Sequence, residues 1–449
     1  MLAPGENQAL NDGRLASSLT EPCKTFVAPN SKTRNMANAS DNIATLSPAA
    51  EAYLWGYPLV ATHRTRLHLC SRHPSGELNH VKGLATPLDK AIVAPNNDTL
   101  YTSGWYDLRH GDLVIEVPPM DKPDRYWNVM IADAYTHVTY IARRHHGTRG
   151  TRVIVRFDPS VPPLDTDTAL ATVGTPTAWV IIRVLVESKD DLEAARKIQR
   201  AIRVTANIGH PKILTERAGR ANQIARGGSA IFEEIQTYMS LDPPAKWHPP
   251  LSQAASDILR SPSSVSNKTL TDGIEEAEGL LAAGNTQDGV LKHGWRTGRG
   301  TGGPGDDILR RAMGAKYGLG GHYPIENRSY IAVHASNGAE LDGNRPLKLK
   351  FASNQLPPCA GFWSLTAYGM DLYLVENAIN RWSISDRTPG LRYEEDGGLT
   401  ITLSAAAPCD SSNWLPVPKG PFMLGMRVYE GEESVLACQW FPPPLQPTD

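Results

Sequence analysis

The sequence predicts a mainly β protein with inserted helices (α+β), in which two jelly-roll-like β-sandwich domains are joined by a helical segment. Apolar and polar residues alternate with a period of two over residues 112–157 and again after residue 347, as in half-buried strands. Between these regions, over residues 227–316, apolar residues recur at helical spacing. The 38 Gly and 35 Pro fall mainly between short apolar runs, which is typical of turns that connect strands.

These changes of period predict the domain boundaries. Residues 1–46 are polar, rich in Asn, Ser, Thr and Ala, and lack the continuous apolar stretch of a signal peptide, so a disordered leader is expected there. We predict an N-terminal β-sandwich over residues 47–205, a helical connecting region over 206–320 and a C-terminal β-sandwich over 321–449.

The first half should contain one early helix, several strands and a second helix. Ser47 and Pro48 are suited to the N-cap and first position of a helix that Pro58 should bend or end. Ser188 and Asp191 form a capping box for the second helix. The expected strands are residues 113–117, 126–131, 152–157 and 178–186, the last of them interrupted by Arg183.

The second half should be helical first and then β. The expected helices are residues 230–239, 251–259, 270–281 and 306–315, and the Gly-rich stretch 299–305 is expected to be a flexible surface loop rather than a phosphate site. The expected strands are residues 347–351, 361–367, 399–403, 422–429 and 435–440.

The composition excludes several functions. Lys and Arg number 45 against 47 Asp and Glu, so no basic surface for nucleic acid is expected. The apolar runs are too short to cross a membrane. The five cysteines are scattered and form no Cys-x-x-Cys pair, which predicts free thiols in a reducing compartment, and hence a cytoplasmic protein. Exposed edge strands allow a homodimer.

Residues 94–108 are the strongest candidate for a ligand-binding wall. Pro95 favours an extended entry, and the amides and carboxylate that follow favour a turn. Aromatic and acidic side chains then follow within one predicted strand, which suits the wall of a ligand-binding site. The alternative is a buried loop whose Asn and Asp side chains form hydrogen bonds with backbone amides. The candidates here are Asp98 and Tyr101 as catalytic residues, and Asn96, Asn97 and Trp105 as substrate-binding residues.

A second polar group, Asp124, Arg125 and Tyr126, adds three catalytic candidates, although an acid and an arginine this close also form structural ion pairs.

Metal and cofactor sites are not indicated. His63, His68, Cys70, His73 and His80 are close in sequence, but their spacing matches no established metal-binding pattern, so surface or capping roles are expected. The sequence also contains no strand–Gly-rich turn–helix unit for a nucleotide and no Gly-x-Ser-x-Gly elbow. We therefore predict no metal and no cofactor.

Several short motifs together resemble a known pair of families. They are Pro95-Asn-Asn-Asp-Thr-Leu-Tyr101, Asp124-Arg-Tyr126, Phe362-Trp-Ser-Leu-Thr-Ala-Tyr368, Asn380-Arg381, Asp396-Gly397, Asn413-Trp-Leu-Pro416 and Trp440-Phe-Pro-Pro443. In this order, over roughly residues 47–444, they resemble the domain of unknown function 1254 followed by the domain of unknown function 1214. The resemblance implies two β-sandwiches with helices between them, and fungal-type members resemble accessory enzymes of specialised-metabolite pathways.

The C-terminal motifs supply further substrate-binding candidates, namely Trp363, Tyr368, Asn380, Arg381, Trp382, Asn413 and Trp414. Trp382 stands where the family's Asn-Arg motif is usually followed by Tyr, and His322 stands where a small amide is more typical. If Trp382 lines the site, its larger ring predicts an altered substrate shape.

Acids and hydroxyls beside aromatic rings favour a cofactor-independent enzyme that acts on a small, partly apolar organic molecule. A desolvated Asp has a raised pKa and can carry out dehydration, cyclisation or isomerisation by proton transfer. We predict Asp98 as the acid/base and Tyr101 as its proton partner. The alternatives are a metal-assisted hydrolase and a non-catalytic protein that binds a glycan or an apolar ligand.

Overall fold

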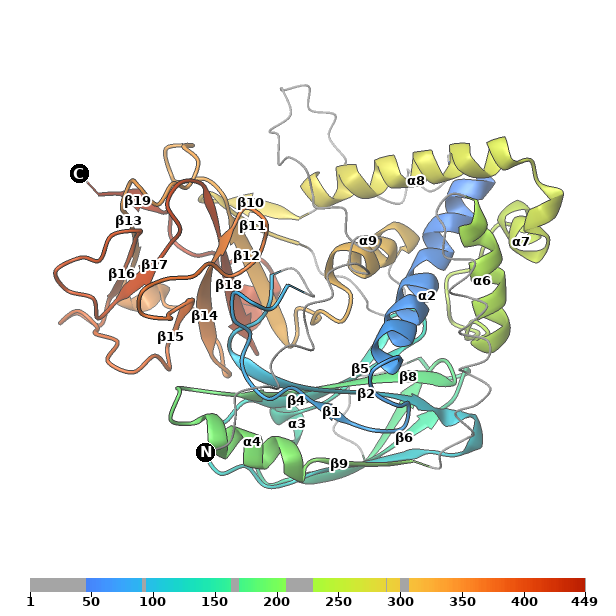
Figure 1. The fold of residues 1–449 in the computed structure, drawn as a ribbon, viewed down its shortest axis with the longest axis horizontal. Helices are drawn as coiled ribbons and strands as arrows, with labels where there is room; N and C mark the ends of the chain where they lie inside the picture. The colour runs from blue at the N-terminus through green and yellow to red at the C-terminus, as the bar shows by residue number, and fades with distance from the viewer. Residues whose placement is uncertain are drawn as a thin grey trace, which may run out of the picture.

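The computed structural model describes residues 46–90, 94–162, 169–206, 229–287, 289–298 and 307–448. The predicted fold class is confirmed: four β-sheets form two sandwiches, and a group of helices lies beside them (Figure 1). The predicted leader and the Gly-rich stretch 299–305 lie outside the described residues.

The N-terminal sandwich is built from a five-stranded and a four-stranded sheet. The first has the order β1 (Asn79–His80), β2 (Thr99–Asp107), β8 (Thr177–Leu185), β4 (Trp127–Asp133), β5 (Val138–Ala142) and is antiparallel throughout. The second has the order β7 (Leu170–Val173), β6 (Thr151–Phe157), β3 (Leu113–Val117), β9 (Arg203–Ala206), with β6 and β7 parallel. The short helix α3 (Arg143–His146) follows β5, a 3₁₀ turn (Leu108–His110) follows β2, and α4 (Leu192–Ala201) follows β8.

The central strand β8 is buried along its whole length because both of its faces are covered. Its even-numbered residues, such as Val180 and Ile182, join the core between the two sheets. Its odd-numbered residues Trp179, Ile181 and Arg183 point to the opposite face, which in Figure 1 faces the helices and the C-terminal domain. This second face carries the site described below.

Five helices share one apolar core beside that face. They are α2 (Pro48–Cys70), α6 (Ala230–Leu241), α7 (Gln253–Arg260), α8 (Asn267–Gln287) and α9 (Ile308–Gly318), with a 3₁₀ turn (Pro262–Ser264) between α7 and α8. Gly56 allows close packing, because a Cβ there would lie 2.4 Å from Ile235 on α6. Helix α2 thus packs with helices that come much later in the chain.

The structure tests three predictions about helix ends. Ser47 caps α2 as predicted, accepting a hydrogen bond from the Ala50 amide. The prediction that Pro58 bends or ends this helix is wrong as to its end, since α2 continues to Cys70. The predicted capping box also fails: α4 begins after Asp191, which makes no side-chain cap bond and instead binds Arg125 and Lys122.

The C-terminal sandwich pairs a six-stranded sheet with a four-stranded one around a separate core. The first has the order β10 (Val290–Lys292), β11 (Trp295–Thr297), β12 (Asn327–Ala332), β18 (Phe422–Tyr429), β14 (Trp363–Gly369), β15 (Ser383–Ser385). The second has the order β17 (Trp414–Pro416), β16 (Leu399–Ser404), β13 (Leu347–Phe351), β19 (Gln446–Pro447), and a 3₁₀ turn (Ser353–Gln355) follows β13.

One predicted strand is wrong. Residues 435–440 do not form a strand; helix α10 (Glu433–Leu436) and irregular chain occupy this region. Val435 is fully buried, so the apolar residues do reach the core, but Cys438 has a φ of 56° and the extended geometry is lost.

Two sequence-level expectations can be compared with the described residues. Cys70, Cys359, Cys409 and Cys438 are free, as predicted. None of the helices in the described ranges is both long and apolar enough to cross a membrane.

Candidate functional site

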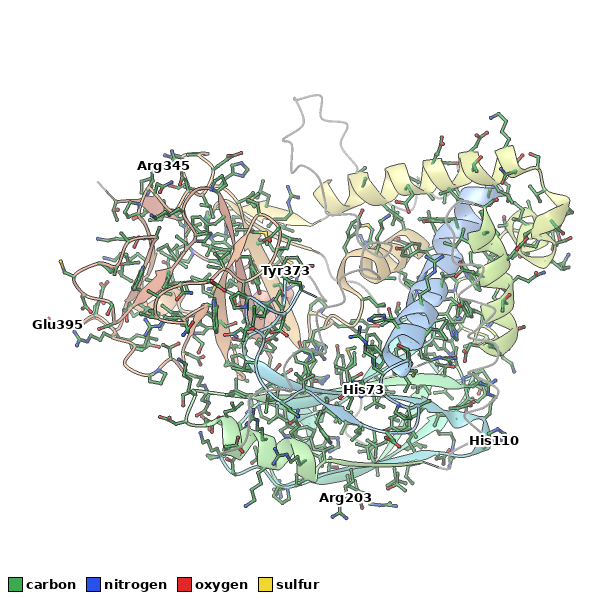
Figure 2. All side chains as sticks on the ribbon, in the orientation of Figure 1. His73, His110, Arg203, Arg345, Tyr373 and Glu395 are labelled. Atoms are coloured by element: carbon green, nitrogen blue, oxygen red, sulfur yellow. The ribbon has the colours of Figure 1, made fainter. Side chains whose placement is uncertain are left out.

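A buried polar cluster lies where the outer face of the five-stranded sheet meets the C-terminal domain. Strand pairing places Tyr101, Arg183 and Asn128 in one row across β2, β8 and β4. Glu326, directly before β12, and Tyr429, at the end of β18, approach this row from the C-terminal domain. Side chains fill the space between the two sandwiches in Figure 2, where the labelled Tyr373 donates from its hydroxyl to the Lys90 carbonyl.

The carboxyl group of Glu326 is at the centre of this interdomain cluster. Its Oε2 accepts hydrogen bonds from the Tyr126 hydroxyl at 2.8 Å and from Asn128 Nδ2 at 2.9 Å, and its Oε1 lies 2.6 Å from Arg144 Nε. Glu326 is fully buried. Burial raises its pKa to about 7, even though Arg144 and the hydrogen bonds from Tyr126 and Asn128 favour the charged form. This carboxyl therefore exchanges its proton near neutral pH.

His322 lies against the same groups from the segment that follows α9. Its Nε2 is 3.4 Å from Asn128 Nδ2, and its Nδ1 is 3.4 Å from the Tyr140 hydroxyl. Burial, together with the positive charges of Arg183, Arg144 and Arg427, lowers the pKa of His322 well below its usual range. The imidazole is therefore neutral at pH 7 and can accept or relay a proton.

The conspicuous segment 94–101 forms the other side of the cluster. Asp98 is buried, and its Oδ2 accepts a hydrogen bond from Ser364 of the C-terminal domain at 2.7 Å. Burial raises the pKa of Asp98, while Arg427 and the Ser364 bond act in the opposite direction. Asn96 Nδ2 donates to the Tyr429 hydroxyl at 2.6 Å. The segment thus joins the two domains as well as lining the cluster.

An apolar pocket adjoins the cluster on the same sheet face. It is a shallow pocket with a cavity volume of only about 30 Å³, and its wall includes Met130, Val138, Trp179, Leu319 and Tyr323 together with Arg311. The Tyr323 amide donates to the Tyr140 hydroxyl at 3.0 Å, so the pocket wall and the cluster share a boundary. A small molecule in this pocket would have its polar end near the cluster.

The structure brings some of the predicted site residues together here. Asp98, Tyr101 and Tyr126 all belong to the interdomain cluster, with the ring of Tyr101 under the Arg183 guanidinium at 4.9 Å. Tyr368 donates to the Pro95 carbonyl at 3.0 Å from the C-terminal side. Trp105 lies farther along the same face, stacked on Trp179 with ring centroids 4.7 Å apart.

Other predicted site residues make contacts that hold the fold together. Arg125 is fully buried and bonds to Asp121, Asp191 and the Leu185 carbonyl, which holds α4 against the sheet. Asp124 is mostly exposed and pairs with Arg387 at 2.6 Å. Asn97 donates to the Ala85 carbonyl. Trp363 is buried in the C-terminal core.

The predicted C-terminal loop residues form a second, separate group within their own domain. Arg381 donates to the carbonyls of Ser411, Ser412 and Trp414, and Asn413 donates to those of Arg392 and Thr400. Their neighbours are placed similarly: the indole of Trp382 donates to the Val375 carbonyl, that of Trp414 donates to the Ser404 carbonyl, and Asn380 is exposed with a φ of 50°. These contacts hold loops together.

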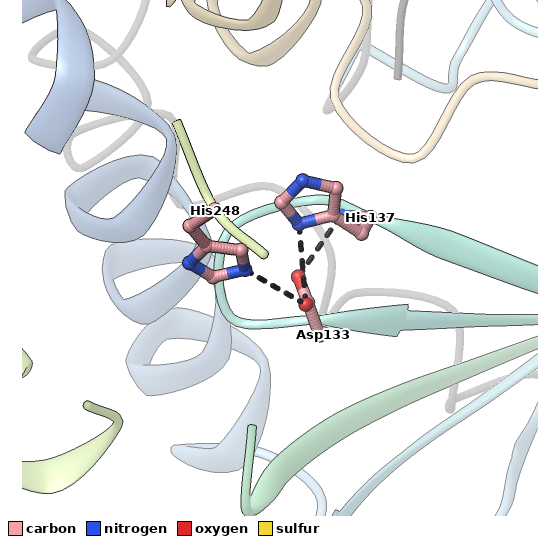
Figure 3. Close-up of side chains that lie close together, drawn as sticks. All are labelled: Asp133, His137 and His248. Atoms are coloured by element: carbon pink, nitrogen blue, oxygen red, sulfur yellow. Dashed lines mark hydrogen bonds and ion pairs between the residues drawn. The ribbon is translucent and has the colours of Figure 1, made fainter. Parts of the chain in front are cut away.

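A third group combines one carboxylate and two imidazoles at the far end of β4 (Figure 3). Asp133 Oδ2 lies 3.2 Å from His137 Nδ1 and 3.7 Å from His248 Nε2, and all three side chains are buried. Asp133 Oδ1 accepts the amides of Tyr135 and His137, both at 2.9 Å, within a tight turn. Burial lowers the pKa of His137 to about 3, against the attraction of Asp133.

One histidine of the N-terminal group is also buried, contrary to the expectation of a surface or capping role. His63 is fully buried on α2, with its Nε2 3.0 Å from Asp242 Oδ2 and its ring stacked on Tyr238. His63 lies on a buried side of α2. The prediction did not take its position on the helix into account.

Sequence reasoning missed Glu326, Arg183 and Tyr429. Arg183 did carry a signal, because it interrupts an otherwise apolar strand, and an arginine in a strand buried on both faces needs a reason. Glu326 carried none, since its burial depends on the contact between the two domains. His322 was noted as unusual but was assigned no role.

The fold is that of a two-domain β-sandwich protein. Residues 75–206 match the family described as "Protein of unknown function (DUF1254)", and residues 326–433 match "Protein of unknown function (DUF1214)". The chain therefore belongs to the proteins that pair these two domains, as the motifs predicted. No curated protein matches it.

Two solved structures match the chain over most of its length. The VPA0106 protein from Vibrio parahaemolyticus is 21% identical with a TM-score of 0.62, over 90% of this chain and 99% of that one. An uncharacterized protein from Burkholderia cenocepacia is 11% identical with a TM-score of 0.43, over 89% and 88% of the two chains. The first of these supports the two-sandwich architecture.

Proposed function

We propose that this protein is an enzyme that transfers protons on a small, partly apolar organic molecule at the interdomain cluster. The observation that carries the proposal is the buried carboxyl of Glu326, which is hydrogen-bonded by Tyr126 and Asn128 from the other domain and lies beside an apolar pocket. Dehydration, cyclisation and isomerisation by proton transfer all need a general acid or base.

The chemistry follows from the environment of this carboxyl. A general acid or base works best when its pKa is close to the working pH, and burial raises the pKa of Glu326 to about 7. Tyr126 and Asn128 fix the orientation of Oε2, so the carboxyl approaches a substrate in one geometry. The guanidinium groups of Arg183 and Arg427 would stabilise negative charge that develops on the substrate.

Asp98 with Tyr101 remains a predicted acid/base pair in the same cluster. Its bond to Ser364 gives Asp98 a structural role across the domain interface in addition. As part of the same proposal we assign the reaction to specialised metabolism, as a lyase or isomerase in the cytoplasm. That assignment is supported by the resemblance of fungal-type family members to pathway enzymes.

The test is proton exchange with solvent. The full chain is incubated in D₂O with a library of partly apolar ketones, acids and β-hydroxy carbonyl compounds, and incorporation of deuterium at carbon is followed by mass spectrometry. We expect Glu326→Gln to lower the exchange rate roughly a hundredfold or more, in the range typical of a general acid or base. Tyr126→Phe should lower it less, because it keeps the carboxyl and removes only the hydroxyl that donates to Glu326 and accepts from Asn128.

The controls separate the candidates. Glu395→Gln changes an exposed carboxyl and should leave exchange unchanged. Exchange that survives Glu326→Gln and disappears in a folded Asp98→Asn variant would transfer the role to Asp98. Binding of library members without any exchange or turnover would favour the non-catalytic ligand-binding protein.

A metal-assisted hydrolase is the second candidate, and the group in Figure 3 favours it, since a carboxylate oxygen and two imidazole nitrogens lie within 4.8 Å of one another. Two imidazoles and a carboxylate suit zinc, which would polarise a carbonyl and activate water. The surroundings fit a cation poorly, because an Arg311 nitrogen lies only 3.2 Å from His137 Nδ1. We therefore place acid/base chemistry at Glu326 first.

A further inference from the structure

Arg183 is a buried cation without a carboxylate partner. Its side chain is 2% exposed, at the centre of β8. Its guanidinium donates to the Gly320 carbonyl at 2.6 Å and stacks over the Tyr101 ring, while its Nε–H is buried and has no hydrogen-bond partner. Within the described ranges no acidic oxygen lies within 4 Å of it. A buried charge in this state is costly unless something else compensates it.

Arg427 is a second guanidinium in a similar position. It donates to the Ala94 carbonyl at 2.9 Å and to the Thr366 hydroxyl at 3.3 Å, and it lies over the Tyr368 ring. Asp98 is near enough to attract it, but in the described part of the chain no carboxylate comes within the 4 Å of an ion pair. Both arginines act electrostatically on His322 and Tyr429, so they face the same space.

The charges around this space do not balance. Arg143, Arg144, Arg183 and Arg427 contribute four positive charges. Asp98, Glu326 and Glu430 contribute at most three negative ones, with Glu430 paired to Arg143, which leaves at least one positive charge. His322 is neutral because its pKa lies well below its usual range. One negative charge would neutralise the cluster, whereas a phosphate dianion would overcompensate it and would be repelled by both carboxyl groups.

The pocket is the place where the apolar part of a ligand would lie. Gly320 and Met130 line it, and both contact the Arg183 guanidinium. Its Nη2 lies 2.6 Å from the Gly320 carbonyl and its Nη1 lies 3.9 Å from the Met130 sulfur. Beyond Arg183 the sheet face becomes apolar, because Ile181 and Trp179 follow on β8. An anionic group at Arg183 would therefore have its attached carbon skeleton over Met130 and Trp179.

From this geometry we infer that the ligand is a small monocarboxylate with an apolar body, its carboxylate bound by Arg183 and its body in the adjoining pocket. This inference rests on the site of the proposed function and names its substrate class. A guanidinium binds a carboxylate by charge-assisted hydrogen bonds that a neutral amide cannot replace.

The experiment compares matched acids and amides by calorimetry on the full chain. The probes are phenylacetate, 3-phenylpropanoate and cinnamate, each measured against its own primary amide. We expect at least one carboxylate to bind roughly tenfold or more tightly than its amide, because a charge-assisted hydrogen bond is stronger than one between neutral groups. Arg183→Met should remove this difference, and Arg156→Met, which changes an exposed arginine paired with Asp112, should preserve it.

Two results would overturn the inference: equal affinity for acid and amide across all three pairs, or an unchanged preference in Arg183→Met. Should Arg183→Met fold poorly because the Gly320 carbonyl loses its donor, Arg183→Lys replaces it, since Lys keeps the charge and one donor but loses the fork. Arg183→Lys should weaken carboxylate binding without abolishing the preference. Glu326→Gln should keep the preference even where it abolishes proton exchange, so failure of the catalytic proposal is distinguishable from failure of this one.

Discussion

Strand β4 begins and ends beside a buried carboxyl group, and the two groups differ in how they are held. Near its start, Glu326 receives its donors from Tyr126 and Asn128 across the domain interface. At its end, Asp133 receives two backbone amides from its own turn and lies between His137 and His248. Burial raises the pKa of Glu326 to about 7. Burial has the same tendency at Asp133, but the two histidines hold the pKa of Asp133 below its usual range.

The difference separates a structural carboxylate from one suited to proton transfer. Local backbone donors cannot move away from Asp133 while the turn exists, so its charge is permanently stabilised. The charge on Glu326 depends on side chains from another domain and is only partly compensated, so its proton is released near neutral pH. A carboxyl group is therefore held in two different ways beside the two ends of one strand.

The largest effect is expected at the Asp133 end. Asp133→Ala leaves two buried amides without acceptors and both histidines without their carboxylate, so we expect it to lower the free energy of unfolding by about 3–4 kcal/mol. Urea unfolding at pH 7 measures this, with Asp112→Ala as the control, whose exposed pair with Arg156 should contribute less than about 1 kcal/mol. Equal losses in the two variants would show that the Asp133 turn is not specially stabilised.

At the start of β4, the contribution of Glu326 to the free energy of unfolding should depend on pH. Unfolded Glu ionises near pH 4.5 and folded Glu326 near 7, so in this interval the folded chain retains a proton that the unfolded chain has lost. The contribution of Glu326 to stability therefore falls as pH rises through this window and stays low above it. Asp133 has the opposite sign, because its lowered pKa makes its contribution fall only as pH drops below the unfolded pKa near 3.8.

Glu326→Gln tests this sign directly. Relative to the wild type, its free energy of unfolding should increase by about 2–3 kcal/mol between pH 5 and pH 8, as a shift of roughly 2.5 pKa units implies. Urea unfolding at both pH values gives the result, and Glu395→Gln, at an exposed position, should show no such change. A difference that does not vary with pH would mean that Glu326 is ionised throughout.

Strands with one buried face were predictable from sequence because alternating residues are buried along them, as in β13, which has the predicted bounds Leu347–Phe351. Strands β4 and β8 are instead buried along their whole length. The failures have local causes. The alternation of residues 435–440 is too short to distinguish a strand from a buried helical turn. Pro58 did not end α2 because packing against four other helices outweighs one missing hydrogen bond.

The candidate site was predictable only on the side where the sequence is unusual. The polar run 96–98 stood out within a β region, and Tyr126 belonged to a recognisable motif. Glu326 and Arg427 look like ordinary polar residues in sequence. The docking of the two domains brings Glu326 against Tyr126 and Asn128 and places Arg427 near Asp98. Likewise, nothing in the sequence relates His248 to Asp133, because the fold brings together two distant loops.

A smaller effect is expected where Asp98 joins the domains. Ser364→Ala removes the hydroxyl that donates to Asp98 Oδ2 at 2.7 Å, and we expect a loss of about 1–2 kcal/mol because a buried acceptor is left unsatisfied. The midpoint of urea unfolding should fall accordingly. Ser160→Ala, which removes an exposed hydroxyl bonded to Asp158, is the control and should change stability by less than about 0.5 kcal/mol. A neutral Ser364→Ala would show that the interface near Asp98 does not need this bond.

The smallest effect is expected from metal addition at the Asp133 end. The Arg311 nitrogen 3.2 Å from His137 Nδ1 already places a positive charge against the group, so a divalent cation would be repelled there. We expect saturating Zn²⁺, added after a chelator wash, to leave the melting temperature of the full chain unchanged. A site that bound Zn²⁺ would stabilise the fold by about 2.7 kcal/mol at a hundredfold excess over its dissociation constant, which a melting curve detects readily. A Zn²⁺-dependent rise in melting temperature that His248→Ala removes would show that the Asp133 group binds a metal. Both ends of β4 would then carry a candidate functional site, and the metal-assisted hydrolase would be favoured.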